Sequence, residues 1–239
     1  MKRVLISGGG IAGLTLALLL KKSGYSPLVI EKAPSVRTEG YMMDFFGTGW
    51  DVAKRIGLIE DIQKVVYPVD KLEFVGKTGQ PWLSVPLEKV RQAMDNEYTY
   101  LRRSDLERIL YNHTKQAGIK ILFGSSITTL TDTGDKVDVQ FESGTKESFD
   151  LVIGADGARS RVRELVFGTG KQFEKYLGYY VAAFHLPNHY GLEKNFITYQ
   201  RPGRSVLLYP LDKKHIDVTF IFSSPNVVFV PLEKQHAML

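Results

Sequence analysis

Cysteine is absent from this chain of 239 residues. Disulfides, thiolate zinc sites and cysteine nucleophiles are therefore excluded. Long apolar runs are absent as well, since no segment reaches the roughly 18 uninterrupted apolar residues that a membrane-spanning helix needs. The apolar run at residues 3–7 resembles the start of a signal peptide, but glycines 8–10 break it and no small-residue cleavage site follows. We expect a cytoplasmic protein without a membrane partner.

Several other chemistries lack their residue patterns. The five histidines do not show the spacing of metal ligands, and no serine lies in the context of a nucleophile elbow. We therefore name no metal ligand and no catalytic residue. The net charge of +5 comes from basic residues scattered among acidic ones, which is typical of a solvated surface and predicts no nucleic-acid partner.

The N-terminal segment has the pattern of a β-α-β unit. Residues 3–7 form an apolar run typical of a strand buried on both faces. Residues 11–23 are rich in leucine and end at Gly24, which predicts a helix with a glycine at its C-terminal cap. Residues 27–31 predict a second buried strand. Such a unit requires a right-handed crossover and a parallel sheet.

The rest of the chain alternates less regularly. Residues 32–48 predict a loop, and residues 49–62 predict one helix from their spacing of apolar side chains. Ser104 and Glu107 match a capping box at the start of a further helix. Residues 137–153 predict a hairpin whose second strand becomes buried.

Strand-like runs between residues 176 and 222, with turn residues between them and no helical pattern, predict an antiparallel sheet. The fold class predicted is α/β, with a Rossmann-like nucleotide-binding domain that contains a parallel sheet and with a second, β-rich domain of α+β character. We assign residues 1–66 and 98–170 to the nucleotide-binding domain. We assign residues 67–97 and 171–239 to the β-rich domain, which we expect to bind substrate.

The first motif that carries chemistry is G-x-G-x-x-G, between the first strand and the first helix. Its first glycine permits the tight turn, its second lets the backbone approach a pyrophosphate, and its third allows close packing of helix on strand. Glu31 ends the second strand, where a carboxylate accepts hydrogen bonds from a ribose diol. A glycine-rich turn that binds nothing is the alternative, and it leaves Glu31 unexplained. The motif and its contacts are Gly8, Gly10, Ile11, Ala12, Gly13 and Glu31.

The second motif is Asp156-Gly157-x-x-Ser160-x-x-Arg163, after the buried strand that ends at Gly154. It resembles the Asp-Gly motif of the flavoprotein aromatic hydroxylases, the family of para-hydroxybenzoate hydroxylase and the tetracycline-inactivating monooxygenases. In that family the motif lies beside the cofactor pyrophosphate and the path of the pyridine nucleotide. Asp156 and Ser160 can also cap a helix, and the two roles are compatible.

Two further stretches extend the resemblance over residues 1 to about 165. The segment from Glu31 and Lys32 through Arg37 to Asp44 resembles the family segment that runs from the ribose to the flavin ring. Arg103 matches the family's Arg-x-Asp-Leu stretch. The resemblance implies that these residues contact FAD, with Arg37 near the flavin or the incoming nicotinamide cofactor. Read by themselves, Arg37 and Arg103 are surface charges.

The resemblance implies an FAD-dependent monooxygenase. Its family reduces FAD with NADPH or NADH and then uses O₂ to transfer an oxygen atom to an aromatic or other electron-rich small molecule. Several aromatic side chains in the β-rich part fit either a substrate pocket or the packing of a sheet face. These are Tyr179, Tyr180, Phe184, Tyr199 and Tyr209.

One family motif has no match. The family's third FAD motif, Gly-Asp-Ala-Ala-His, grips the ribityl chain and the edge of the flavin. The one Gly-Asp pair here is Gly134-Asp135, which Lys136 follows in a polar turn. We therefore expect a truncated version that lacks the C-terminal part of the family fold. The alternative is a non-catalytic dinucleotide-binding fragment that needs a partner chain to supply the missing segment.

Overall fold

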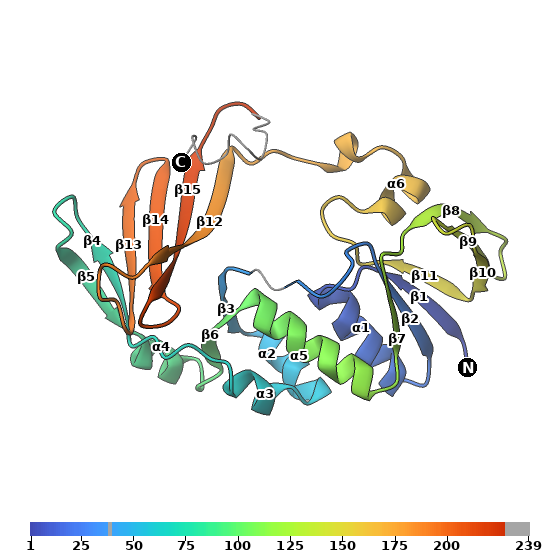
Figure 1. The fold of residues 1–239 in the computed structure, drawn as a ribbon, viewed down its shortest axis with the longest axis horizontal. Helices are drawn as coiled ribbons and strands as arrows, with labels where there is room; N and C mark the ends of the chain where they lie inside the picture. Colours follow the sequence, from blue (N-terminus) through green and yellow to red (C-terminus); the bar gives the residue numbers. More distant parts are fainter. Residues whose placement is uncertain (38–39, 228–239) are drawn as a thin grey trace. The chain divides into compact units, whose positions relative to one another are not determined.

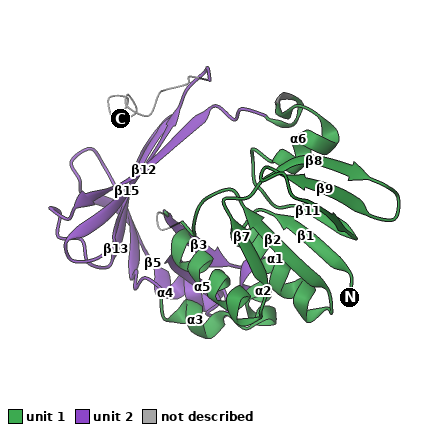
Figure 2. Cartoon of the chain, turned by 45° about the vertical axis from the view of Figure 1, so that its right-hand side comes forward, with its two compact units in different colours: residues 1–40, 51–65, 102–174 green, residues 41–50, 66–101, 175–239 purple. Residues whose placement is uncertain are grey.

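The chain folds into two compact units in the computed structural model, which describes residues 1–37 and 40–227 (Figures 1 and 2). The first unit contains Met1–Gly40, Asp51–Val65 and Arg102–Glu174. The second unit contains Tyr41–Trp50, Val66–Leu101 and Lys175–Leu239.

The boundaries of the units differ from the predicted domains at residues 41–50 and 98–101, and by a few residues at 66 and 171–174. Residues 41–50 and 98–101 belong to the second unit, because strands β3 (Met42–Phe46) and β6 (Tyr98–Arg102) pair with each other and pack into its core. The assignment of cofactor to one unit and substrate to the other remains a prediction.

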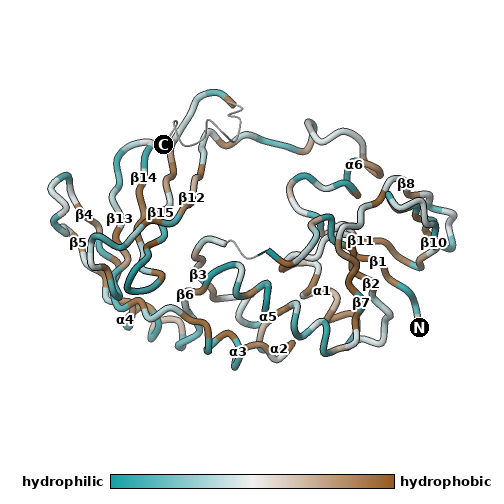
Figure 3. The backbone as a smooth tube through the Cα atoms, in the orientation of Figure 1, coloured by the Kyte–Doolittle hydropathy of each residue, from teal (hydrophilic) through white to brown (hydrophobic). Residues whose placement is uncertain are grey.

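A four-stranded parallel sheet forms the centre of the first unit. Its order is β11-β1-β2-β7, so β1 lies between two neighbours from distant parts of the chain. Val4, Leu5 and Ile6 of β1 are fully buried, which explains why this strand is a continuous apolar run (Figure 3). The strands are β1 (Arg3–Ser7), β2 (Ser26–Glu31), β7 (Lys120–Phe123) and β11 (Leu151–Gly154). The predicted α/β fold class is confirmed.

Helix α1 (Ile11–Lys22) connects β1 to β2 and packs against α5 (Arg103–Gln116) (Figure 1). The single helix predicted over residues 49–62 is wrong. The chain forms α2 (Thr48–Ile56) and α3 (Ile59–Gln63) instead, because Gly57 between them has a φ of +81° that ends the first helix. No helix within the described residues combines the length and apolar character needed to cross a membrane.

A three-stranded antiparallel sheet, β10-β9-β8, completes the first unit. Its inner side chains and those of the parallel sheet share one core, in which Leu5, Ile30, Phe141 and Phe149 are buried. The predicted hairpin over residues 137–153 contains β9 and β10 and continues directly into β11. The three strands are β8 (Ile127–Asp132), β9 (Val137–Phe141) and β10 (Lys146–Phe149), and helix α6 (Arg161–Phe167) and a 3₁₀ turn (Gly170–Phe173) follow.

The second unit is built on a six-stranded sheet of order β12-β15-β14-β13-β4-β5. All neighbours are antiparallel except β13 and β4, which run parallel. The loop predicted over residues 32–48 is wrong at 42–46, where β3 forms and pairs with β6. The remaining elements are β4 (Lys71–Val75), β5 (Pro81–Pro86), α4 (Leu87–Ala93), β12 (Tyr179–Pro187), β13 (Asn195–Arg201), β14 (Arg204–Pro210) and β15 (His215–Ser223).

Truncation of Leu5 tests the shared core of the first unit. Leu5→Ala removes a fully buried side chain and leaves a cavity, so we expect a loss of about 2 to 5 kcal/mol in the free energy of unfolding. Val166→Ala is the control, because Val166 is exposed on α6, and its cost is expected within about 0.5 kcal/mol. Urea unfolding followed by circular dichroism measures both. Equal costs would contradict this account of the core.

Candidate functional site

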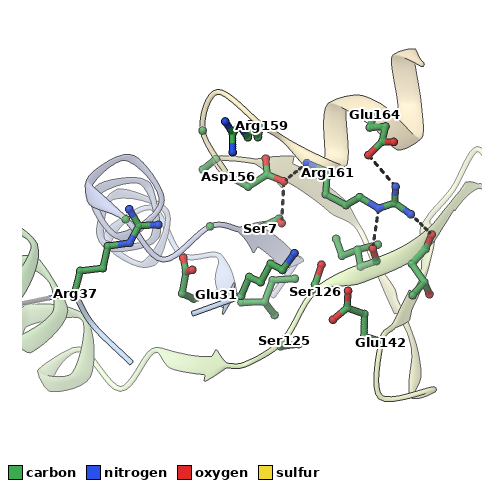
Figure 4. A pocket seen from close by; sticks show the side chains of 18 of the residues that line it. Ser7, Glu31, Arg37, Ser125, Ser126, Glu142, Asp156, Arg159, Arg161 and Glu164 are labelled. Carbon is green, nitrogen blue, oxygen red and sulfur yellow. Dashed lines mark hydrogen bonds and ion pairs between the residues drawn. The ribbon is translucent and has the colours of Figure 1, made fainter. Parts of the chain in front are cut away.

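A cavity of about 610 Å³ opens at the carboxyl ends of the parallel strands in the first unit (Figure 4). Ser7 and Glu31 end β1 and β2, while Ser125 and Ala155 follow β7 and β11, and all four line the cavity. The connection through α1 leads from β1 to β2 on one side, and β11 lies on the other side of β1. Open α/β sheets bind ligands at such a switch in strand order.

Two glycines of the loop after β1 are required by the chain's own packing. Gly8 has a φ of +115°, and a Cβ atom there would lie 2.3 Å from the carbonyl oxygen of Ala155. Its N–H donates to the carbonyl of Ile30 at 2.8 Å. A Cβ atom on Gly13 would lie 1.9 Å from the carbonyl oxygen of Gly8. The loop therefore fits against β2, β11 and α1 only without these side chains.

Gly10 differs from these two glycines because no packing contact within the protein requires the absence of a side chain at this position. A Cβ atom there would meet only the side chains of Arg103 and Glu107, at 3.8 and 3.9 Å. Its φ of −83° suits any residue. Gly10 lines the cavity, so the missing side chain leaves the backbone open to a ligand. This is the space that a pyrophosphate group needs.

Helix α1 presents an uncapped N-terminus beside this open backbone. Gly10 is the N-cap, no side chain accepts a hydrogen bond there, and the first turn contains no acidic residue. Ile11, Ala12 and Gly13 form that turn, and the first N–H groups of a helix have no partner within it. Together with the helix dipole these N–H groups favour an anion. The glycine loop and helix therefore fit the phosphates of a dinucleotide.

Glu31 connects the end of β2 to the glycine loop. Its Oε2 accepts a hydrogen bond from the N–H of Gly9 at 2.8 Å, and its Oε1 accepts one from the N–H of Ala33 at 2.8 Å. Each carboxylate oxygen keeps further acceptor capacity. Glu31 can therefore hold the loop and accept a ribose hydroxyl at the same time.

The capping box predicted at Ser104 and Glu107 is wrong. Helix α5 begins at Arg103, and Glu107 is buried, with its Oε2 accepting a hydrogen bond from Nη1 of Arg103 at 2.9 Å. The ion pair forms because the two residues lie one helical turn apart. Both line the cavity, so the pair presents the Arg103 guanidinium beside Gly10.

Asp156 holds the start of α6. Its Oδ2 accepts hydrogen bonds from the N–H groups of Arg161 at 2.8 Å and Val162 at 3.2 Å, and from the Ser7 hydroxyl at 3.4 Å. Its Oδ1 accepts from the Ser160 hydroxyl, and that hydroxyl oxygen caps the helix by accepting from the N–H of Arg163 at 3.0 Å. The capping role considered for this motif is therefore present, and Asp156 also lines the cavity.

The structure brings most of the predicted contact residues together. Ile11, Ala12 and Gly13 lie at the start of α1, while Asp44 belongs to the second unit and is not part of this lining. The predicted residues that line the cavity are Gly8, Gly10, Glu31, Lys32, Arg37, Arg103, Asp156 and Gly157.

Sequence reasoning missed several polar residues of the lining. The position of Ser125 and Ser126 just after β7 was a usable signal, because loops at the carboxyl ends of parallel strands form such sites. Arg159 and Arg161 carried the same signal, since they lie within the Asp-Gly motif directly after β11. Glu142 had no such signal, because only the folded chain brings it to this edge.

A smaller cavity of about 230 Å³ lies in the second unit. Asp44 and Tyr100 line it, and the Tyr98 hydroxyl donates to Oδ1 of Asp44. The hydroxyl oxygens of Tyr98 and Tyr100 are also within hydrogen-bond distance, at 2.6 Å. Burial raises the pKa of Tyr98 and raises that of Tyr100 to about 12, so both phenols stay protonated at neutral pH. Of the five aromatic residues considered for a pocket, Tyr209 lines this cavity.

The profile of a protein family described as FAD binding domain matches residues 1–226 of this chain. The chain belongs to this family. The fit of the glycine loop, the α1 N-terminus and Glu31 to a dinucleotide agrees with FAD as the ligand. The resemblance to flavin-dependent monooxygenases described above is confirmed at the level of the family.

Two curated relatives illustrate the similarity. An uncharacterized protein of Mycobacterium tuberculosis, Rv1260, is 40% identical over 192 residues, which are 79% of this chain and 50% of that protein. The FAD-dependent monooxygenase asL4 of Sarocladium schorii is 33% identical over 214 residues, 86% of this chain and 49% of that protein. The chain thus spans about half the length of the curated relatives it matches.

Two solved structures share the fold of this chain and are likewise longer than it. Tetracycline destructase Tet(55) superimposes with a TM-score of 0.85 at 27% identity, over 100% of this chain and 61% of that one. HpxO of Klebsiella pneumoniae, solved with FAD and uric acid, superimposes with a TM-score of 0.83 over 100% of this chain and 60% of that one. At 22% identity, HpxO supports the fold alone.

Alanine substitutions at Gly13 and Gly10 distinguish a glycine that packing requires from a glycine that ligand binding requires. Gly13→Ala places a methyl group against the backbone of Gly8, so we expect the chain to lose stability or fail to fold. Gly10→Ala meets no backbone, so its free energy of unfolding should fall by about 1 kcal/mol or less. Its affinity for FAD should fall at least tenfold. Urea unfolding and FAD titration measure the two effects, and unchanged FAD affinity in Gly10→Ala would refute the assignment of Gly10.

The role of Asp156 as a cap has its own test. Asp156→Ala removes the acceptor for two helix N–H groups, and we expect a loss of roughly 0.5 to 2 kcal/mol in the free energy of unfolding. Asp135→Ala, in the exposed turn between β8 and β9, is the control with no loss expected. If Asp156→Ala weakens FAD binding and leaves stability unchanged, the residue acts on the ligand rather than on the helix.

Proposed function

We propose that this chain is the cofactor- and substrate-binding part of an FAD-dependent monooxygenase. It uses NADPH or NADH and O₂ to hydroxylate an aromatic or other electron-rich small molecule. The observation that carries the proposal is the cavity at the carboxyl edge of the parallel sheet, with Gly10 open toward it and Glu31 at the end of β2.

Each predicted contact has a role in binding FAD. The loop from Gly8 to Gly13 and the α1 N-terminus would hold the pyrophosphate, and Glu31 would accept the ribose hydroxyls. Lys32 and Arg37, both exposed at the cavity, provide positive charge for phosphate groups of the cofactor and of the nicotinamide nucleotide. The remaining contacts in the proposal are Asp44, Arg103, Asp156 and Gly157.

FAD held by these residues would supply the redox chemistry, namely hydride transfer from the nicotinamide cofactor and activation of O₂ for transfer of one oxygen atom. The chain's own residues bind, orient and shield. In the second unit, the cavity of about 230 Å³ has apolar and aromatic walls, among them Phe196 and Leu207. Such walls suit a planar aromatic ligand. The tetracycline named for Tet(55) supports this class of ligand.

An absorbance spectrum after incubation with FAD and desalting tests the proposal. We expect the visible bands of oxidised flavin to remain with the protein, and we expect this preparation to consume NADPH or NADH under air. Gly10→Ala is the matched control, because it closes the space beside the loop without a clash in the protein. It should retain little flavin.

Two outcomes would change the proposal. A chain that retains FAD but does not consume either nicotinamide cofactor would favour the non-catalytic fragment that needs a partner chain. A colourless chain with no affinity for FAD would contradict the assignment of the cavity. The partner chain and the cytoplasmic location remain predictions.

A further inference from the structure

Another cavity of the second unit opens at one end of the six-stranded sheet, where β13 begins and β14 ends. Its volume is about 280 Å³. Among the residues that the structure describes, it shares no part of its lining with the cavity of about 230 Å³. Three chain segments form its wall, namely residues 67–69 before β4, residues 193–194 before β13 and residues 210–213 from the end of β14 into the turn before β15.

The register of the sheet brings these three segments together. β13 and β4 run parallel, with Asn195 opposite Lys71, so both strands begin at the same end of the sheet. β14 runs antiparallel to β13, with Leu208 opposite Ile197, so β14 ends there as well. The cavity is therefore a direct result of the strand order.

The buried part of the lining is apolar. Val69 is 2% exposed and Pro210 is buried, while the half-buried side chains of Tyr67 and Leu211 pack against the same core cluster as Val69. Pro68 completes this part of the lining. Because proline has no N–H group, neither proline leaves a backbone donor without a partner when an apolar group covers it. An apolar group of a ligand can therefore be buried here at little cost.

Backbone hydrogen bonds hold the wall in place. The N–H of Asp70 donates to the carbonyl of Lys194 at 2.8 Å, which joins the segment before β4 to the segment before β13. The N–H of Leu211 donates to the carbonyl of His215 at 2.9 Å, which closes the turn between β14 and β15. The cavity is therefore formed before a ligand arrives, and binding requires little ordering of the chain.

Two of the four charged residues of the lining have ion-pair partners. Nζ of Lys194 lies 3.6 Å from Oδ2 of Asp70. Oδ2 of Asp212 lies 3.0 Å from Nδ1 of His215, and the hydrogen bond from His215 is the main reason why the pKa of Asp212 is lowered to about 2. These charges are compensated within the protein.

The other two charged residues, Lys213 and Glu193, are exposed and have opposite charges. Within the described part of the chain, neither side chain has an ion-pair or hydrogen-bond partner. A ligand that has both a carboxylate and an ammonium group would complement both residues. A ligand with a single charge would gain one partner and meet one like charge.

We propose that this cavity binds an α-amino acid with an apolar or aromatic side chain. The side chain lies against Val69 and Leu211, the carboxylate pairs with Lys213 and the ammonium group pairs with Glu193. Ligand cavities begin at about 300 Å³, so a volume of about 280 Å³ suits a ligand with one ring. The site goes beyond the proposed monooxygenase function and does not depend on it.

The test is calorimetric titration of the full chain, without FAD, with L-phenylalanine and two analogues. 3-Phenylpropionate lacks the ammonium group, and phenethylamine lacks the carboxylate. We expect L-phenylalanine to saturate one site, and we expect each analogue to bind about two- to fivefold more weakly, the range for one exposed ion pair.

Two variants assign the charges. Lys213→Gln should bind L-phenylalanine and phenethylamine equally, because the carboxylate no longer has a partner. Glu193→Gln should bind L-phenylalanine and 3-phenylpropionate equally. Lys214→Gln is the matched control, since Lys214 is exposed beside Lys213 but does not line the cavity, and it should keep both preferences.

Photolabelling locates the site without a substitution. 4-Azido-L-phenylalanine, irradiated with the full chain and followed by trypsin digestion and mass spectrometry, should label the peptide of residues 65–71, which contains the first wall segment. An excess of L-phenylalanine should prevent this labelling.

Four results would overturn the proposal. These are no binding of L-phenylalanine, equal binding of all three ligands by the unchanged chain, preferences that persist in both Lys213→Gln and Glu193→Gln, and labelling confined to peptides outside the wall. Neither FAD nor a nicotinamide cofactor enters these measurements, so their failure is distinct from failure of the monooxygenase proposal.

Discussion

The close approach of the glycine loop to the ends of the parallel strands is the constraint on which the first unit depends. Gly8 lies against the backbone of Ala155, and Gly13 lies against the carbonyl of Gly8. These contacts fix α1 relative to β1 and β11, so that its N-terminus opens into the cavity. Glu31 then binds the loop to β2. One set of backbone contacts thus provides both the packing of the unit and the shape of its anion site.

The parts of the fold that the sequence predicted are those with strong local periodicity. The β-α-β unit and the Asp-Gly turn before α6 have buried, continuous patterns whose meaning does not depend on distant residues. The errors occur where tertiary contacts decide. β3 forms within a loop-like segment because β6 pairs with it, and Glu107 is held by Arg103 instead of capping α5.

The residues of the candidate site could be predicted under the same condition, namely where a local pattern determines their position. Residues of the glycine loop and Glu31 could be named because a short motif determines their position. Glu142 lies in no such motif and lines the cavity only because the folded chain brings it there. Asp44, which the resemblance names as a cofactor contact, lies in the second unit and accepts a hydrogen bond from the Tyr98 hydroxyl, and its role toward the cofactor stays a prediction.

The parallel sheet of the first unit and the six-stranded sheet of the second unit each pair strands that lie far apart in the sequence. β1 pairs with β11, where Val4 lies opposite Leu151, and β4 pairs in parallel with β13, where Leu72 lies opposite Phe196. During synthesis, β1 and β4 therefore each have an edge without its partner strand until more than half of the chain has been made. Pairings of such sequence separation fold slowly and expose apolar strands to aggregation. Refolding of the full chain from denaturant is therefore expected to be slow and to compete with aggregation at high protein concentration.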